Sequence, residues 1–207
     1  MSSTLDRHAA ARVFLRELSD IVYKFKPSND ERAPTYALLP TGGKAHRVQI
    51  AGAVTDYIPA DERNSNSGKL TIANEEGTIS VYPNRYTPDD AIDQITSLSP
   101  PCHVAVTGKP ELIDTDDKDD PLTTLQVESI SEISQSDRDI WMTEVAVRTT
   151  ERINALQSFH DTHPPDAEPD SVEDILRSRA LDVYGADVGA YVEAARAHLD
   201  APKRAQA

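Results

Sequence analysis

Residues 46–59 read HRVQIAGAVTDYIP, and their alternation of apolar and polar side chains decides the fold. One side of the segment carries Val48, Ile50, Gly52 and Val54. The interleaved positions carry Arg47, Gln49, Thr55 and Tyr57. A period of two residues is typical of a strand with one buried face, so the segment predicts such a strand.

Further strands are predicted over residues 69–73, 78–82, 102–108 and 122–133, with residues 110–113 as a candidate extension of the third of these. The first two of these are joined by Asn74-Glu75-Glu76-Gly77, which reads as a tight hairpin turn. Before residue 102, Thr87 as N-cap and Pro88 at the first helical position predict a helix. The order strand, strand, strand, helix, strand, strand predicts a mainly β chain with a five-stranded OB-fold barrel. A small sandwich is the alternative, because element order does not determine strand pairing.

Helices are predicted on both sides of these strands. Residues 6–25 carry apolar side chains at spacings of three and four, which predicts an amphipathic N-terminal helix. C-terminal helices are predicted over residues 139–159, 171–184 and 187–199. We therefore expect an N-terminal helix and linker (1–35), an OB-fold domain (36–136), an interaction helix (137–160), and a linker with a small helical segment (161–207).

The chain is acidic, with a formal net charge of -14 over 207 residues. This balance argues against strong phosphate-driven binding of nucleic acid by the chain alone. The excess is uneven, because residues 44–110 hold six basic and eight acidic side chains and sum to only -2. Asp outnumbers Glu by 22 to 13 and Arg outnumbers Lys by 14 to 7, a composition suited to a salt-rich cytoplasm. We therefore hypothesise a halophilic source, the alternative being an ordinary acidic mesophile protein.

Other compositional features exclude several classes of protein. The single cysteine, Cys102, rules out an intramolecular disulfide. No apolar run approaches the ~20 residues of a membrane span, and the N-terminus lacks an apolar signal region, so a cytoplasmic protein is expected. The sequence contains no P-loop, dinucleotide fingerprint or G-x-S-x-G motif. We accordingly expect no enzyme activity and no cofactor.

An OB-fold binds single strands by stacking bases on aromatic rings beside a basic groove. Candidates on the predicted strands and their loops are Lys44, Arg47, Tyr57, Arg63, Lys69, Tyr82, Arg85 and Tyr86. These residues form the predicted DNA-binding site. The alternative is structural, with Tyr82 at the barrel rim and Tyr57 at a strand end.

Several segments, taken in order, resemble a known family. They are residues 12–18 (RVFLREL), 36–42 (YALLPTG), 47–55 (RVQIAGAVT), 86–88 (YTP) and 137–141 (DRDIW). Together they resemble the archaeal replication-protein-A family, specifically its haloarchaeal RPA-associated OB-fold proteins, over about residues 8–160. The resemblance implies a role in single-stranded DNA replication, repair and recombination, as a partner of the large subunit of replication protein A.

The resemblance also implies a use for the long C-terminal helix. In replication-protein-A assemblies, a helix after the barrel packs with the equivalent helices of other subunits. The corresponding apolar stripe here is Trp141, Val145, Thr149, Ile153 and Leu156. Packing on the chain's own barrel or N-terminal helix is equally compatible with that stripe. A protein-binding assembly factor that makes no DNA contact is therefore the second functional hypothesis.

A metal-dependent phosphoesterase is a third hypothesis with little support. The acidic segment 114–120 contains Asp116 and Asp117, but its spacing does not match a calcium-binding EF-hand loop. His160 and His163 lie in or next to a proline-rich stretch that does not hold them in place for a metal. A hydrated acidic turn is the favoured interpretation, and we expect no metal site.

Overall fold

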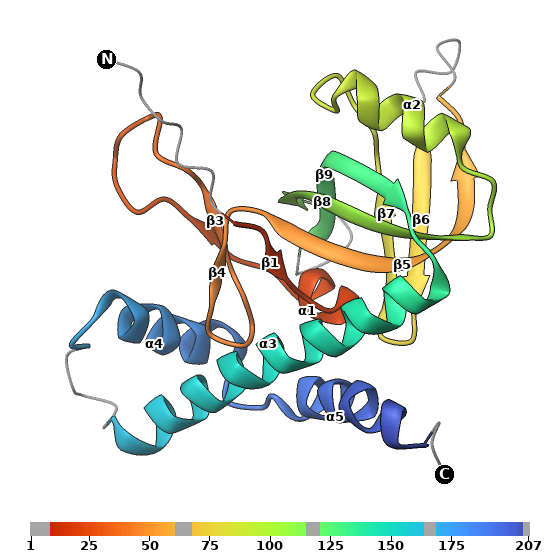
Figure 1. Ribbon diagram of the computed structural model, residues 1–207. Coiled ribbons are helices and arrows are strands. Elements are labelled where there is room, and N and C mark those ends of the chain that lie inside the picture. The colour runs from red at the N-terminus through yellow and green to blue at the C-terminus, as the bar shows by residue number, and fades with distance from the viewer. Residues whose placement is uncertain (1–8, 61–67, 115–120, 164–168, 205–207) are drawn as a thin grey trace, which may run out of the picture.

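The computed structural model describes residues 9–60, 68–114, 121–163 and 169–204 (Figure 1). Within these stretches the chain is mainly β with several helices, as the sequence predicts. Its strands form one six-stranded sheet and one three-stranded sheet. No helix in the four stretches is both long and apolar enough to cross a bilayer.

The large sheet contains the five strands that the alternation predicts. They are β5 (Val48–Ile58), β6 (Lys69–Asn74), β7 (Gly77–Val81), β8 (Cys102–Ile113) and β9 (Leu122–Glu132). Their order is β7-β6-β5-β8-β9, and each neighbouring pair is antiparallel. The curved strand β5 is central, because its first half pairs with β8 and its second half with β6 (Figure 1). The two edge strands meet where the Thr124 hydroxyl donates to the Ser80 carbonyl at 2.8 Å.

The predicted helix over residues 6–25 is wrong. From Ala11 onward the chain forms β1 (Ala11–Arg12), α1 (Leu15–Ser19) and β2 (Lys24–Phe25). Strand β1 adds to β5 in parallel and is the sixth strand of the large sheet, which the five-strand prediction lacks. The Ala11 N–H donates to the Arg47 carbonyl at 2.8 Å. The backbone here therefore forms its hydrogen bonds with a neighbouring segment and not within a helix.

A small sheet lies beside the large one and contains β2, β3 (Tyr36–Leu38) and β4 (Lys44–Ala45). The turn between β3 and β4 closes where the Leu39 N–H donates to the Gly43 carbonyl at 2.8 Å. Gly42 in this turn has a φ of 88°, a left-handed conformation that favours glycine. The backbone of the turn therefore depends on Gly42.

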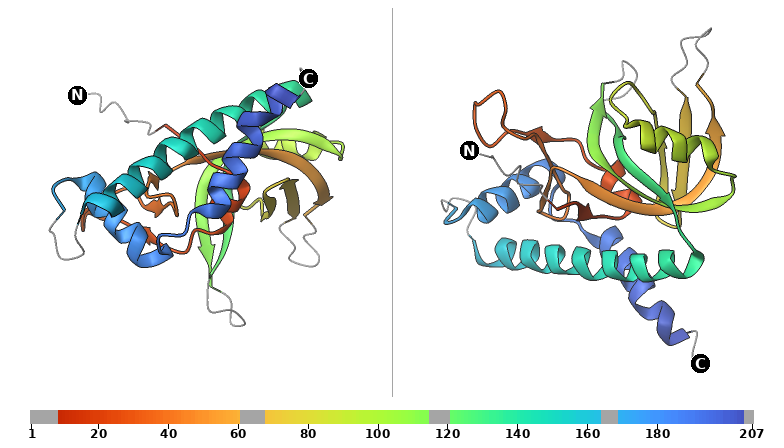
Figure 2. Two further views of the ribbon diagram at one scale, coloured as in Figure 1. Left: turned by 90° about the horizontal axis from the view of Figure 1, so that it is seen from below. Right: turned by 45° about the horizontal axis from the view of Figure 1, so that its top comes forward.

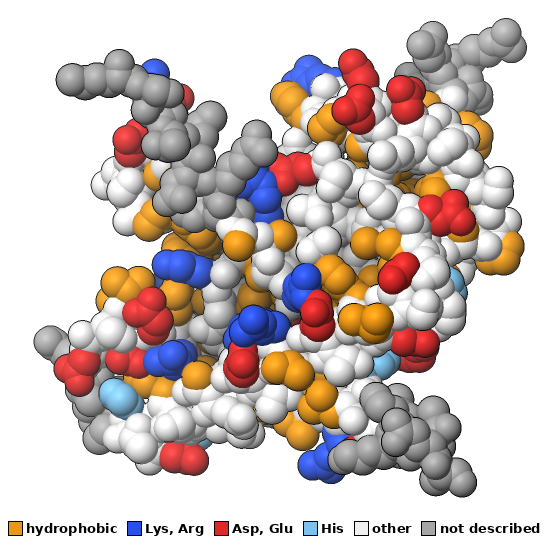
Figure 3. Space-filling view, viewed as in Figure 1, with side chains coloured by type: hydrophobic (Ala, Val, Ile, Leu, Met, Phe, Trp, Pro, Cys, Tyr) orange, Lys and Arg blue, Asp and Glu red, His pale blue; other side chains and the backbone are white. Residues whose placement is uncertain are grey.

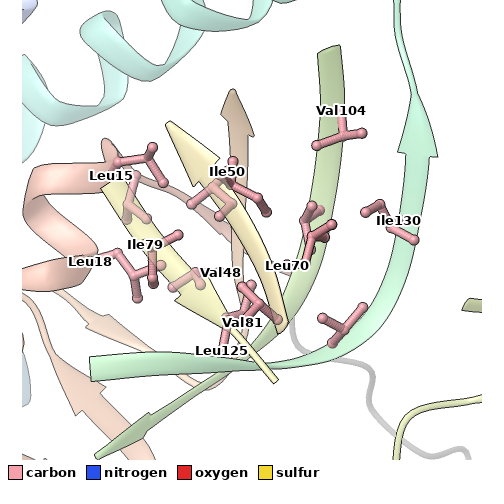
Figure 4. Packing of buried hydrophobic residues seen from close by; sticks show 14 of the residues in the cluster. Leu15, Leu18, Val48, Ile50, Leu70, Ile79, Val81, Val104, Leu125 and Ile130 are labelled. Carbon is pink, nitrogen blue, oxygen red and sulfur yellow. The ribbon is translucent and has the colours of Figure 1, made fainter. Parts of the chain in front are cut away.

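Figure 4 shows the apolar core on the inner side of the large sheet. The labelled side chains are Leu15, Leu18, Val48, Ile50, Leu70, Ile79, Val81, Val104, Leu125 and Ile130. Helix α1 contributes to this core from one side of the strands, and α2 (Asp89–Ser97) contributes Ala91 and Ile95 from the other (Figure 1). Helix α2 begins one residue later than predicted, with Pro88 as its N-cap, and the Thr87 hydroxyl instead accepts from the Asn84 N–H at 3.0 Å.

Three helices form a layer beside the two sheets, two of them against the outer side of the large sheet and one beside the small sheet (Figure 2). They are α3 (Gln135–Thr162), α4 (Val172–Tyr184) and α5 (Gly189–Arg204). Helix α3 begins four residues earlier than predicted, because Ser134 and Asp137 form a capping box there. Gly185 ends α4 with a φ of 77°, which confirms the predicted break between the last two helices.

The apolar stripe of α3 lies inside the chain. Trp141 and Val145 pack in one cluster with Phe14, Ala51 and residues of α5. Ile153 and Leu156 pack in another cluster with Leu38, Leu176 and Tyr191. Thr149, between them, is fully buried. The structure therefore corresponds to the alternative of packing on the chain's own sheet and helices, and this face of α3 offers no surface to a partner.

A buried charge network joins the helical layer to the sheet. The Glu17 side chain in α1 is 0% exposed, and it pairs with Arg152 of α3 at 2.7 Å. Thr41, in the turn between β3 and β4, donates to the Glu17 carboxylate and accepts from Arg152 Nε at 2.8 Å. Arg152 also donates to the Thr149 hydroxyl at 2.9 Å. A buried carboxylate needs such partners, because leaving it unpaired in the interior is strongly unfavourable.

Replacing Arg152 by Met is therefore expected to lower the free energy of unfolding by about 3–5 kcal/mol, since it leaves Glu17 buried and unpaired. Arg148→Met is the matched control on the same helix, because its ion pair with Glu151 is exposed. The control is expected to change stability by less than about 0.5 kcal/mol. Urea unfolding followed by circular dichroism measures both variants, and equal losses would contradict the assigned role of the network.

Candidate nucleic-acid interface

Three strand ends place a row of side chains on the outer face of the large sheet. Ile58 of β5 pairs with Lys69 of β6, and Leu70 pairs with Val81 of β7. Leu70 and Val81 are fully buried on the inner face, so the alternation puts Lys69 and Tyr82 at the next position on the outer face. Ile58 is 43% and Tyr82 is 41% exposed. We call Ile58, Lys69 and Tyr82 the outer row.

A pocket of ≈ 450 Å³ opens at the same strand ends. Tyr57 and Gly68 line it from β5 and from the residue before β6. The segment after β7 contributes Pro83, Asn84 and Arg85. Helix α2 contributes Ile92, Ile95 and Thr96. We call this cavity the end pocket, and its walls are mainly apolar with polar groups from Asn84, Arg85 and Thr96.

Gly68 lets the chain close at the edge of the end pocket. Its φ is 84°, and a Cβ built there would lie 3.1 Å from the Ala60 nitrogen and 3.2 Å from the Ile58 carbonyl oxygen. A larger residue would strain the backbone and push the two strand ends apart. The glycine therefore helps to set the shape of this site.

Arg85 and Tyr86 form an exposed stacked pair next to the pocket. The guanidinium carbon lies 4.7 Å from the ring centroid, and its nitrogen donates to the Tyr86 hydroxyl at 2.6 Å. Tyr86 is 63% exposed, which is high for an aromatic ring. An exposed ring and a cation at one place are the groups that a stacked base and its phosphate require.

The structure thus brings Tyr57, Lys69, Tyr82, Arg85 and Tyr86 to one end of the sheet, which is five of the eight predicted DNA-binding residues. Arg47 lies apart, next to the first residue of β5, whereas Tyr57 is near its last. Eleven residues of strand separate the two ends, about 35 Å along the chain. Arg63 lies outside the described residues.

The two remaining basic candidates have partners in the chain. Arg47 forms an ion pair with Glu128 of β9, and Lys109 lies 3.6 Å from the same carboxylate. The Lys44 ammonium lies 5.4 Å from the ring centroid of Tyr36 in the small sheet. Arg47 and Lys44 therefore lie away from the outer row, and their predicted DNA-binding role gains no support from that row.

Negative charge surrounds the site. Asp56 is exposed two residues before Ile58, and Asp89, Asp90 and Asp93 are exposed on α2. Figure 3 shows acidic and basic side chains interspersed over one face of the molecule, without a continuous basic surface. The site therefore offers more aromatic and apolar surface than positive charge.

Other chemistry has little support in the described part of the chain. There, no group of three or more His, Cys, Asp or Glu side chains is placed to hold a metal. Asp116 and Asp117, the residues of the phosphoesterase hypothesis, fall outside that part. Burial, and then the charge of Glu132, raise the pKa of the Cys102 thiol, which disfavours the reactive thiolate.

No known family model and no curated protein matches the sequence. Among solved structures, a chain of the S. pombe Stn1–Ten1 complex aligns with a TM-score of 0.54 at 15% identity, covering 74% of this chain and 99% of that one. A small single-stranded DNA-binding protein of Streptomyces coelicolor aligns with a TM-score of 0.32 at 16% identity, covering 44% and 94%. An OBody bound to hen egg-white lysozyme aligns with a TM-score of 0.36 at 19% identity, covering 42% and 80%. The first of these likenesses supports the fold, which is that of OB-fold proteins.

The ion pair of Glu128 predicts a pH dependence of stability. Burial raises the pKa of Glu128, but hydrogen bonds and positive charge from Arg47 and Lys109 outweigh it and hold the pKa below its usual value. A lowered pKa adds stability above the unfolded pKa of about 4.3, and that stability is lost as the pH falls through the folded pKa. Glu128→Gln is therefore expected to lose less stability than the wild type between about pH 5 and the acid limit.

Urea unfolding at a series of pH values measures this effect. The control is Glu132→Gln, an exposed residue of the same strand with no ion pair among the described residues. It is expected to keep the acid-induced loss of the wild type. If Glu128→Gln loses as much stability on acidification as the wild type does, the assignment of this loss to Glu128 is contradicted.

Proposed function

We propose that this chain binds single-stranded DNA through the outer row and the Arg85–Tyr86 pair. The observation that carries the proposal is the exposure of Tyr82 beside Lys69, where β6 begins and β7 ends, together with the exposed Arg85–Tyr86 pair. In OB-folds the corresponding second and third strands, with the adjoining loops, bind oligonucleotides. Each stacked base contributes about 1–3 kcal/mol to the free energy of binding, so stacking on two rings would contribute substantially.

A second proposal concerns the type of barrel and is consistent with the first. We propose that β5 to β9 form the five strands of an OB-type barrel, with β1 as an addition. The antiparallel order β7-β6-β5-β8-β9 and the contact of its two edges through Thr124 and Ser80 support closure. The position of α2 between β7 and β8 matches the helix that follows the third strand of such a barrel.

We further propose that the chain acts with the large subunit of replication protein A, in DNA replication, repair and recombination. The support is the resemblance in sequence together with the net charge of -14, which makes strong phosphate-driven binding by this chain alone unfavourable. A partner with a basic groove would supply the missing attraction. In the hypothesis of an assembly factor without DNA contact, the apolar stripe of α3 cannot be the interface, because that stripe is buried in the chain.

Fluorescence anisotropy with labelled oligo-dT, with and without the partner subunit, tests the proposal. Tyr82→Ala is expected to weaken binding by about 5- to 150-fold, because one stacking platform is lost. Lys69→Ala is expected to reduce the slope of log affinity against log salt by about 0.7, the value for one phosphate contact on a single strand. Arg148→Ala, an exposed change on α3, is the control and is expected to bind as the wild type does.

Two results would count against DNA binding by this site. One is the absence of binding by the wild type alone, together with no gain in affinity when it is added to the partner subunit. The other is binding that Tyr82→Ala and Lys69→Ala leave unchanged. Retention of the partner in the first case would favour the assembly factor.

The halophilic source is a separate proposal that rests on composition. The excess of Asp over Glu and of Arg over Lys supports it, because carboxylates repel one another less when salt screens them. The melting temperature is therefore expected to rise between dilute buffer and molar KCl. A melting series in KCl, with NaCl as a parallel series, measures this, and equal stability throughout would contradict the proposal.

A further inference from the structure

We propose that the end pocket takes one nucleobase of the bound strand, turned inward from the outer row. This inference rests on the proposed function, because it concerns a strand that already lies on that row. It adds a second mode of contact, in which a base enters a cavity rather than stacking on an exposed ring.

The pocket and the row lie next to each other along three strands. Tyr57 of the pocket precedes Ile58 of the row, Gly68 precedes Lys69, and Pro83 follows Tyr82. Successive residues of a strand are about 3.3 Å apart along the chain, but their side chains point to opposite faces of the sheet, so the pocket lies behind the row, around the strand ends. A nucleic-acid strand that crosses the row therefore reaches the pocket by turning around these strand ends.

The size and the lining of the pocket suit a nucleobase. Its volume of ≈ 450 Å³ lies in the range of roughly 300–1,000 Å³ that is typical of small-ligand sites. Tyr57, Pro83, Ile92 and Ile95 supply aromatic and aliphatic walls. A nucleobase is a flat ring with polar groups along its edge. Its faces would pack against walls of this kind, and its edge would need a hydrogen-bonding group in the pocket.

Asn84 supplies that polar group. Its side-chain oxygen accepts from the Tyr86 N–H at 2.9 Å, and its own N–H donates to the Thr87 hydroxyl at 3.0 Å, so the residue is held in place. Among the hydrogen bonds of the described residues, none uses its side-chain NH₂ group as donor. That donor is thus available to a carbonyl oxygen on the edge of a base.

The charges around the pocket favour the base over the phosphate. Asp89, Asp90 and Asp93 are exposed on α2, whose inner residues line the pocket, and they repel a phosphate that would lie deep in it. Arg85 is the basic residue among those that line it, and it is exposed. We therefore place the base inside and its phosphate outside, near Arg85.

A pocket-filling variant tests the inference. Thr96 is exposed, and its hydroxyl donates only to carbonyls of its own helix, those of Ile92 and Asp93 at 3.0 Å. Thr96→Phe therefore fills the cavity without removing a tertiary bond. Thr162→Phe is the matched control, because Thr162 is exposed and donates to the Ser158 carbonyl of its own helix at 2.7 Å.

Anisotropy with oligo-dT and photocrosslinking with an oligonucleotide that carries 5-iodouracil are the two measurements, made on the full chain with its partner. We expect Thr96→Phe to weaken binding by at least about 5-fold, the loss of one base contact, and Thr162→Phe to bind as the wild type does. We also expect crosslinks to Tyr57 in the wild type, and their loss in Thr96→Phe.

The outcomes separate the two proposals. The pocket inference is overturned if Tyr82→Ala weakens binding but Thr96→Phe does not. It is also overturned if the wild type crosslinks at Tyr82 and Tyr86 but not at Tyr57. Both results leave the proposed function intact. Failure of the wild type to bind oligo-dT overturns both.

Discussion

The buried carboxylate of Glu17 is the constraint on which the rest of the structure depends. It needs a cation and a hydroxyl in the interior, and it obtains them from Arg152 of α3 and from Thr41 in the turn between β3 and β4. The turn must approach α3 closely, since a Cβ on Gly43 would lie 2.9 Å from Arg152 Cδ. One ion pair thus holds α1, the small sheet and the helical layer in a single arrangement.

That arrangement determines which surface stays open. Helices α3 and α5 cover the outer side of β5, and α1 and α2 pack against the core from two sides (Figure 2). The hairpin between β6 and β7 is tied to the same layer, because Glu75 pairs with Arg138 and Glu76 lies 3.1 Å from His198. The opposite ends of β6 and β7 carry the outer row, so the candidate interface lies where the helical layer leaves the sheet uncovered.

Much of the fold was predictable, because it rests on local signals. The alternation predicts all five long strands, and the Asn74 to Gly77 turn predicts the hairpin between two of them. The helix over residues 6–25 was not correctly predicted, because its apolar residues are shared among three clusters and their spacing mimics one helical stripe. In the candidate site, residue type pointed to Tyr82 and Tyr86, but it did not separate Arg85 from Arg47, whose charge is already paired with Glu128.

The sequence by itself therefore determined the strands, the long C-terminal helix and the set of aromatic and basic residues, since each follows from periodicity or residue type. Only the tertiary structure decided which of these residues meet. It buried the stripe of Trp141 inside the chain, paired Arg47 with Glu128, and gathered Tyr57, Lys69 and Tyr82 at one end of three strands. The physical reason is that strand register and ion pairing depend on residues far apart in the chain, which no local pattern specifies.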